Sequence, residues 1–279
     1  MAGCKFLTYI TFINYALFMS KKTILAVAVA TLALGQVAKA QTNLQVFYDF
    51  APDRQHVTTT LEGFYTDNWG NTFFFMDHDF GSKNNQNQVY APSGTYLEIA
   101  RCLNFWQDVP VLGDFSLQVE YNGGVYNGYT INNAFLGGID YFLHSSDFKN
   151  TFNFKLLGKY IHYQGNDLSG NPRKSLAPLQ FTFVWGMQDL FGVTGLRFSG
   201  FADFWFESHS VITGVDSLGI PQWEDRPYVF ISEPQIWYNV GQHFGVPNLN
   251  VGGEVELSFD FGTSPGFKAR PCAGIKWVF

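Results

Sequence analysis

Ionisable side chains recur at every second position in several segments of this chain. Glu254 and Glu256 share one face of "LNVGGEVELSFDF", and Arg197, Asp203 and Glu207 share one face of "LRFSGFADFWFE". With this spacing they would point to the same side of a β-strand. Carboxylates and cations on facing surfaces create a field that orients a dipolar molecule. The pattern therefore predicts recognition of a small polar solute.

The predicted binding residues are the inward members of alternating segments. They are Glu98, Glu120, Lys155, Lys159, Arg197, Asp203, Trp205, Glu207, Glu233, Glu254, Glu256 and Arg270. The same parity adds Glu62, Asp140, Asp260, Lys268 and Lys276. We expect Glu256 to pair with Arg270 on the neighbouring strand, and Lys155 and Lys159 to lie opposite the acidic strand. The alternative is that these charges only satisfy one another inside a mostly closed structure.

Hydrolysis is a competing interpretation, because a Ser beside a His can act as a nucleophile. "HSS" (144–146) falls in a predicted turn, whereas His162 and Ser175 fall on neighbouring predicted strands and could approach one lipid-facing surface. The other histidines lack metal-ligand spacing. Gly-rich pieces such as "GFYTDNWGN" are predicted hairpin turns, because no helix follows them. We therefore predict no enzyme, no metal site and no cofactor.

Composition indicates what surrounds these residues. Charged residues make up 14% of the chain and aromatic residues 18%, with 30 Phe. A soluble domain contains about 25% charged residues. The net charge of −6 argues against a nucleic-acid partner, which requires basic clusters. Many aromatics, few charges and no membrane-helix-length apolar run after residue 40 favour an all-β, antiparallel transmembrane β-barrel.

The N-terminus is predicted to be an export leader, residues 1–40. Lys21 and Lys22 precede the apolar "TILAVAVATLALG" and then "AKA", the order of a secretory signal peptide cut after Ala40. The signal core is 19–40 and residues 1–18 are an upstream extension; a retained anchor is the alternative. The mature chain, 41–279, then has 13 basic and 23 acidic residues, a net charge of −10. We expect its Cys102 and Cys272 to be free thiols, although export permits a disulfide.

Twelve alternating segments are expected in one domain. They are 44–50, 57–65, 72–80, 95–105, 115–122, 132–143, 151–163, 176–187, 194–206, 226–240, 249–261 and 268–279. Segments of about ten residues match tilted strands that cross a bilayer. Connections after even-numbered segments read as short periplasmic turns, whereas 81–94, 164–175 and 207–226 read as longer extracellular loops. An even count places both termini on the periplasmic side.

The tenth segment, "YVFISEPQIWYN", contains Pro234. Proline inside a paired strand usually marks a bulge, and bulges re-aim side chains near functional sites. Glu233, Gln235 and Trp237 are therefore candidates for testing. A kink at the rim of the barrel is the alternative.

The chain stops inside the last alternating segment, "CAGIKWVF". We expect Ile275, Trp277 and Phe279 to face lipid, and the last strand to pair with the first so that no edge is open in the membrane. This ending resembles the C-terminal sorting signal of outer-membrane barrels. The expected partners are therefore outer-membrane lipid and the barrel-assembly machinery.

The order of segments resembles the nucleoside-specific channel-forming (Tsx-like) porin family. The likeness rests on "WGNTFFFMDHDFG" (69–81), "YLEIARCLNF" (96–105), "FLGGIDYFLHSSDFKNTFNFKLLGKYIHYQG" (135–165) and "DLFGVTGLRFSGFADFW" (189–205). This resemblance implies a monomeric twelve-stranded barrel in the bacterial outer membrane and passive uptake of small polar solutes such as nucleosides. A structural or adhesive barrel without a conducting path is the alternative, and an outer-membrane lipid hydrolase is a further one.

Overall fold

The computed structural model describes residues 40–81, 92–126, 129–166 and 172–279. The chain divides into Met1–Lys39 and Ala40–Phe279, and only the second unit is described. The predicted leader and most of the 81–94 connection therefore lie outside the described residues. No helix in these four stretches is long and apolar enough to cross a membrane.

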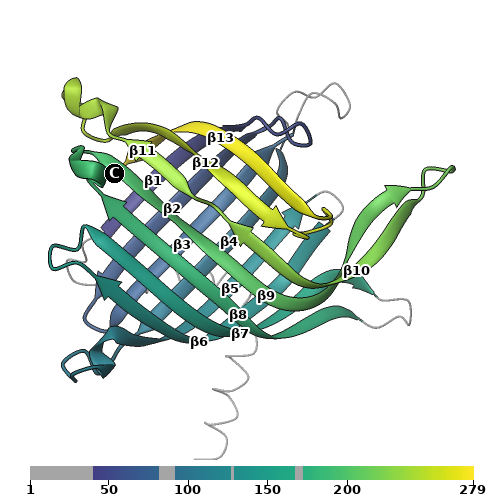
Figure 1. The fold of residues 1–279 in the computed structure, drawn as a ribbon, viewed down its shortest axis with the longest axis horizontal. Helices are drawn as coiled ribbons and strands as arrows, with labels where there is room; N and C mark the ends of the chain where they lie inside the picture. The colour runs from purple at the N-terminus through teal and green to yellow at the C-terminus, as the bar shows by residue number, and fades with distance from the viewer. Residues whose placement is uncertain (1–39, 82–91, 127–128, 167–171) are drawn as a thin grey trace, which may run out of the picture. The chain divides into compact units, whose positions relative to one another are not determined.

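Antiparallel strands form a single closed sheet (Figure 1). The strands are β1 (Ala40–Asp49), β2 (Val57–Asp67), β3 (Gly70–Phe80), β4 (Pro92–Leu103), β5 (Phe115–Tyr126), β6 (Tyr129–His144), β7 (Asn150–Asn166), β8 (Pro172–Gln188), β9 (Leu196–Val215), β10 (Pro221–Ser232), β11 (Gln235–Tyr238), β12 (Leu249–Phe259) and β13 (Phe267–Val278). Short 3₁₀ helices occupy three connections: η1 (Leu112–Asp114), η2 (Leu190–Gly192) and η3 (Val240–His243). Because β10 and β11 are two parts of one wall strand, the barrel has the twelve strands that alternation predicts.

The first and last strands close the barrel. β1 pairs with β13 from Asn43 opposite Val278 to Asp49 opposite Cys272. The Phe279 amide also donates to the Thr42 carbonyl at 2.9 Å. Pairing around the ring satisfies the backbone groups that would otherwise be unpaired in lipid. The predicted closure is thus confirmed.

Pro234 interrupts the tenth wall strand without shifting its register. Between Ser232 and Gln235 the pairing advances by three residues, both along β10–β11 and along its neighbours β9 and β12. Proline has no N–H to donate, but the Pro234 carbonyl accepts from the Val255 amide at 3.1 Å. The bulge predicted at Pro234 is therefore wrong: the ladder is broken there, but no residue is inserted.

Register shifts do occur beside other prolines, and two of them lie near inward charged residues. One lies between Arg226 and Tyr228 of β10, at Pro227. Another lies between Leu157 and Lys159 of β7, where residues 178–179 of β8 are passed over. Since an extra residue on one strand bends the sheet, both bulges bend the wall close to Lys159 and Glu207.

The two faces of the wall differ as predicted. Outward side chains include Leu44, Phe135, Phe181 and Ile275, all exposed, whereas inward positions carry buried polar groups such as Gln118. Exposed apolar side chains would be costly in water, but they match the lipid-facing band of a membrane barrel. Cys102 and Cys272 are both free thiols, as expected.

The segment 207–226, predicted as a long loop, is instead strand. β9 continues to Val215 and β10 begins at Pro221, so that residues 216–220 form the turn. Figure 1 shows the resulting β9–β10 hairpin extending beyond the barrel. Connections at the end that carries the C-terminus are not uniformly short, because 104–114 and 239–248 contain η1 and η3. Loop length alone therefore does not distinguish the two ends.

Candidate functional site

The interior of the barrel is filled by side chains at its middle levels. Gln45, Gln118, Asp140, Leu157 and Trp237 point inward and are each at most 1% exposed. A wide aqueous pore would leave such wall residues accessible to solvent. Any path through the barrel is therefore narrow and lined by polar groups.

Lys155 and Lys159 lie in a mixed-charge cluster, here called the lysine group. β7 places both lysines inward, and the other members come from β4, β5, β6 and β9. Lys155 interacts electrostatically with Glu98, Glu120 and Asp140. Lys159 interacts with Glu98, Glu120, Asp203 and Glu207. The lysine group is defined as Glu98, Glu120, Asp140, Lys155, Lys159, Asp203 and Glu207.

Lys159 is fixed over an aromatic ring. Its Nζ lies 3.6 Å from the centroid of Trp205 and donates to Gln180 Oε1 at 2.8 Å. Nε1 of Trp205 donates to Glu207 Oε2 at 2.7 Å, and the Tyr163 hydroxyl donates to Glu207 Oε1. Trp205 is only 6% exposed. One face of this ring, predicted as a stacking surface, is therefore already covered by a cation.

A second cluster forms where β12 and β13 meet. Glu256 pairs with Arg270 in the strand register, and Glu256 Oε1 lies 2.6 Å from Arg270 Nη1. The predicted lateral ion pair is thus confirmed. Glu254 accepts from Gln235 Nε2 at 2.8 Å and interacts electrostatically with Glu233. The predicted acidic strand, β12, is therefore paired with a cation, Arg270, on the adjacent strand β13.

The lysine group and the β12–β13 cluster thus each combine acids and cations, so that the described residues do not form one basic wall facing one acidic wall. Carboxylates from strands on both sides surround Lys155 and Lys159. Glu256 of β12 is compensated by Arg270 and by Arg54, whereas Glu254 interacts electrostatically with Lys276. A polar solute inside the barrel would consequently meet donors and acceptors together at each cluster.

A cavity of 230 Å³ opens at the end of the barrel where β1 begins and β13 ends. Arg197, Trp237 and Lys276 line it together with Asn43 and Asn250. Lys276 Nζ lies 4.3 Å from the centroid of the Trp237 ring. The predicted residue Arg197 therefore belongs to this mouth of the barrel, apart from the lysine group.

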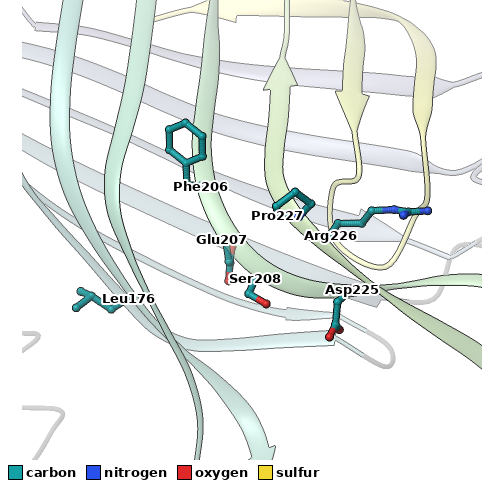
Figure 2. A pocket seen from close by; sticks show the side chains of 7 residues that line it. All are labelled: Leu176, Phe206, Glu207, Ser208, Asp225, Arg226 and Pro227. Atoms are coloured by element: carbon teal, nitrogen blue, oxygen red, sulfur yellow. The ribbon is translucent and has the colours of Figure 1, made fainter.

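A cleft of 360 Å³ lies at the opposite end, at the Pro227 bulge. Figure 2 shows Glu207 and Ser208 on β9 beside Pro227 on β10, with the Arg226 side chain pointing away from Glu207 and with Leu176 on the neighbouring strand. The carboxylate of Glu207 holds Trp205 beneath Lys159. The cleft therefore borders the lysine group from the side of the β9–β10 hairpin.

The predicted sorting residues form part of the outer wall. Ile275, Trp277 and Phe279 are exposed by 53%, 41% and 68%. Trp277 pairs with Leu44 of β1. These side chains are placed to contact lipid at the closing seam.

The hydrolase pair is separated by the sheet. Ser175 pairs with Ile161, a buried inward residue, whereas His162 pairs with Lys174. Cross-strand partners share a face, so that Ser175 and His162 point to opposite sides of the wall. Among the described residues, no group of three or more His, Cys, Asp or Glu has the arrangement of a metal site.

Sequence reasoning missed three charged residues near Glu256. Arg54 Nη2 bonds to Glu256 Oε2, Asp53 bonds to Arg270, and Asp49 lies 3.4 Å from Arg54. Parity could have found Asp49, since Leu44, Val46 and Tyr48 alternate with it. Asp53 and Arg54 lie in the connection 50–56, which has no period to indicate its direction.

Residues 41–279 match the model of a protein family, a domain of unknown function designated DUF5020. The chain belongs to this family. The Tsx-like resemblance is accordingly supported only at the level of a porin-like outer-membrane barrel. No curated protein matches the chain.

The chain is similar to solved structures of outer-membrane proteins. A structure described as the NanC porin is 8% identical over 85% of this chain and 98% of its own, with a TM-score of 0.52. OmpT lacking loop L8, an outer membrane protein of Vibrio cholerae, is 8% identical over 87% and 99%, with a TM-score of 0.39. The NanC likeness shows the fold alone: a closed antiparallel barrel of the outer-membrane porin type.

Proposed function

We propose that this protein is a narrow outer-membrane channel for passive movement of small polar solutes. The observation that carries the proposal is the lysine group, a mixed-charge cluster inside a closed barrel. Burying ionisable groups away from water is costly. A barrel that served only as a wall could satisfy its interior more cheaply with apolar or neutral side chains. Retained charges that can bind a passing solute are typical of selective pores.

Nucleosides are the first solute class to test, by the resemblance of the sequence to Tsx-like porins. A sugar carries donors and acceptors that Lys155, Glu98 and Glu120 could match. A base could stack on Trp205 only if Lys159 moved from the ring, because Nζ lies 3.6 Å from its centroid. Hydrogen bonding to the ribose is therefore the better-supported mode of recognition, with the base passing beside the indole.

A structural barrel without a conducting path is the second candidate, favoured by the burial of Gln45, Gln118 and Asp140. Ion current through single proteins in a planar bilayer separates the two. The channel proposal expects discrete current steps that nucleosides reduce reversibly in a concentration-dependent manner. Intact barrels, identified by heat-modifiable migration, that carry no current would support the structural candidate.

A further inference from the structure

The connection between β1 and β2, residues 50–56, folds back against the barrel interior. The Phe50 amide donates to the Pro271 carbonyl of β13 at 3.0 Å. The Ala51 amide donates to Asp49 Oδ1 at 2.7 Å, and Ala51 is 2% exposed. The Arg54 amide then closes a turn onto the Ala51 carbonyl at 3.0 Å. This turn directs the Arg54 side chain toward β12.

Ion pairs of alternating charge join this connection to β12 and β13. Asp53 Oδ2 lies 2.8 Å from Arg270 Nη2, and Arg270 Nη1 lies 2.6 Å from Glu256 Oε1. Glu256 Oε2 binds Arg54, whose Nη1 lies 3.4 Å from Asp49 Oδ2. Charge-assisted bonds of this kind are stronger than neutral ones. The five residues form one continuous chain of ion pairs along three adjacent strands, β1, β13 and β12, at the end of the barrel that carries the 50–56 connection.

Arg54 also reaches charges that belong to other strands. It interacts electrostatically with Glu233, in the gap between β10 and β11, and with Asp77 of β3. Burial alone would lower the pKa of Arg54, but the charges of Glu256, Asp49 and Glu233 raise it above its ordinary value. The guanidinium is therefore a permanent cation extending from the loop into the lumen.

We propose that residues 50–56 are a latch across the lumen and that Arg54 is the residue that determines which solutes pass. The inference rests on the channel function proposed above. With the latch in place, a solute must pass a fixed guanidinium and its carboxylate partners. Without it, the loop end of the lumen widens and gains net negative charge, so that larger and more cationic solutes enter.

A native thiol reports the state of this latch without relying on transport. Cys272 pairs with Asp49 on β1 and with Glu254 on β12, and it interacts electrostatically with Arg54. Replacing Cys4 and Cys102 by Ala leaves Cys272 as the thiol to be read. The probe is the small cation 2-aminoethyl methanethiosulfonate, added to the purified barrel in detergent.

Arg54→Ala should increase the rate of Cys272 modification about tenfold, as expected when an opening equilibrium loses a charge-assisted contact. Arg54→Lys, which keeps the charge but not the planar fork, should give an intermediate rate. The matched control is Arg101→Ala: Arg101 pairs with Asp67 at 2.8 Å and has no part in the latch. It should leave the rate unchanged.

Heat-modifiable migration verifies that each variant is folded. If Arg54→Ala does not assemble, Asp53→Asn replaces it, because this change removes one contact at a side chain that is 50% exposed. Unchanged Cys272 modification in a folded Arg54→Ala or Asp53→Asn barrel would overturn the latch. Faster modification with no solute uptake in any variant would keep the latch and contradict the channel function, so that the two failures are distinguishable.

Discussion

The ammonium group of Lys159 lies 3.6 Å from the centre of the Trp205 ring, and both side chains are buried inside the barrel. A cation held over a desolvated aromatic face is stabilised by about 2 kcal/mol. Lys159 also lies among Glu98, Glu120, Asp203 and Glu207. The ammonium group of Lys159 therefore covers one face of the Trp205 ring, and its positive charge offsets the carboxylates around Lys159.

Replacing Lys159 by Ala should make the channel more selective for cations. Removing one positive charge leaves the carboxylates of the lysine group uncompensated, and the attraction of a passing cation weakens with distance and with the effective dielectric constant. We expect the cation-to-anion permeability ratio to rise about twofold or more, which corresponds to about 0.4 kcal/mol. The reversal potential in a KCl gradient measures it. Lys149→Ala is the matched control, because Lys149 is an exposed turn residue that pairs with Asp189 outside the lysine group. An unchanged ratio in Lys159→Ala would place this lysine outside the ion path.

Removing Glu256 should destabilise the barrel. Its carboxylate compensates both Arg54 and Arg270, and losing one partner of a buried ion pair costs about 3–5 kcal/mol. Glu256→Ala should therefore unfold at a lower urea concentration in detergent, followed by tryptophan fluorescence. Glu224→Ala, a change of the same type on the exposed hairpin, should unfold with the wild type. Coincident transitions for Glu256→Ala and the wild type would show that the pair contributes no net stability.

Acid should weaken the contact between Asp53 and Arg270. Burial alone would raise the pKa of Asp53, but the hydrogen bond and charge of Arg270 lower it below its ordinary value of 3.8. A carboxyl group with a lowered folded-state pKa stabilises the fold above the unfolded value and loses this contribution as the pH falls through the folded value. Because the Asp53–Arg270 contact holds the proposed latch in place, its loss should open the lumen. The conductance of the wild-type protein should therefore rise below pH 3.8.

In Asp53→Asn this pH-dependent rise should be absent, since Asn has no proton to gain. The measurement is single-channel conductance from pH 7 downward, with the folded state verified at each pH by circular dichroism. A rise of equal size in both proteins would assign the effect to another carboxylate.

Loss of the closing aromatic residues should prevent assembly. The Phe279 amide bonds to Thr42, and Trp277 pairs with Leu44. Deleting Phe279, or changing Trp277 and Phe279 to Asp, removes the predicted sorting signal and places charge on the lipid face. The outer-membrane yield should fall to near zero on a heat-modifiability gel. Leu218→Asp at the hairpin tip, 82% exposed, should assemble normally; normal yield of the Phe279 deletion would refute the sorting role.

Alternation predicted the wall well because each strand has one lipid face and one interior face. The inward parity of Glu98, Lys155 and Asp203, and the pairing of Glu256 with Arg270, follow from that period alone. Period cannot show how far apart strands stand across the lumen. Lys155 and Lys159 were expected to lie opposite the acids of β12. In the structure they instead interact with carboxylates of β4, β5, β6 and β9.

The remaining errors concern places where period gives no information. The bulge at Pro227 arises from an extra residue on the partner strand β9, and no such residue lies opposite Pro234. The sequence around each proline does not show this difference. Only the register distinguishes them. The positions of Arg54 and Asp53 depend on contacts more than 200 residues away in sequence: Arg54 with Glu256, at a separation of 202 residues, and Asp53 with Arg270, at 217. The β9–β10 hairpin did leave a signal: β-branched residues continue through Val211 and Val215.

Uptake into liposomes tests the central claim most directly. Mature protein is reconstituted, and swelling is followed in nucleosides, sugars and amino acids of similar size. A selective channel whose filter is the lysine group should take up nucleosides faster than the other two classes. Lys155→Ala combined with Lys159→Ala should remove that preference, and Trp205→Ala should weaken it. Equal uptake of all three classes by the wild type, or no uptake through barrels shown to be folded, would contradict the account.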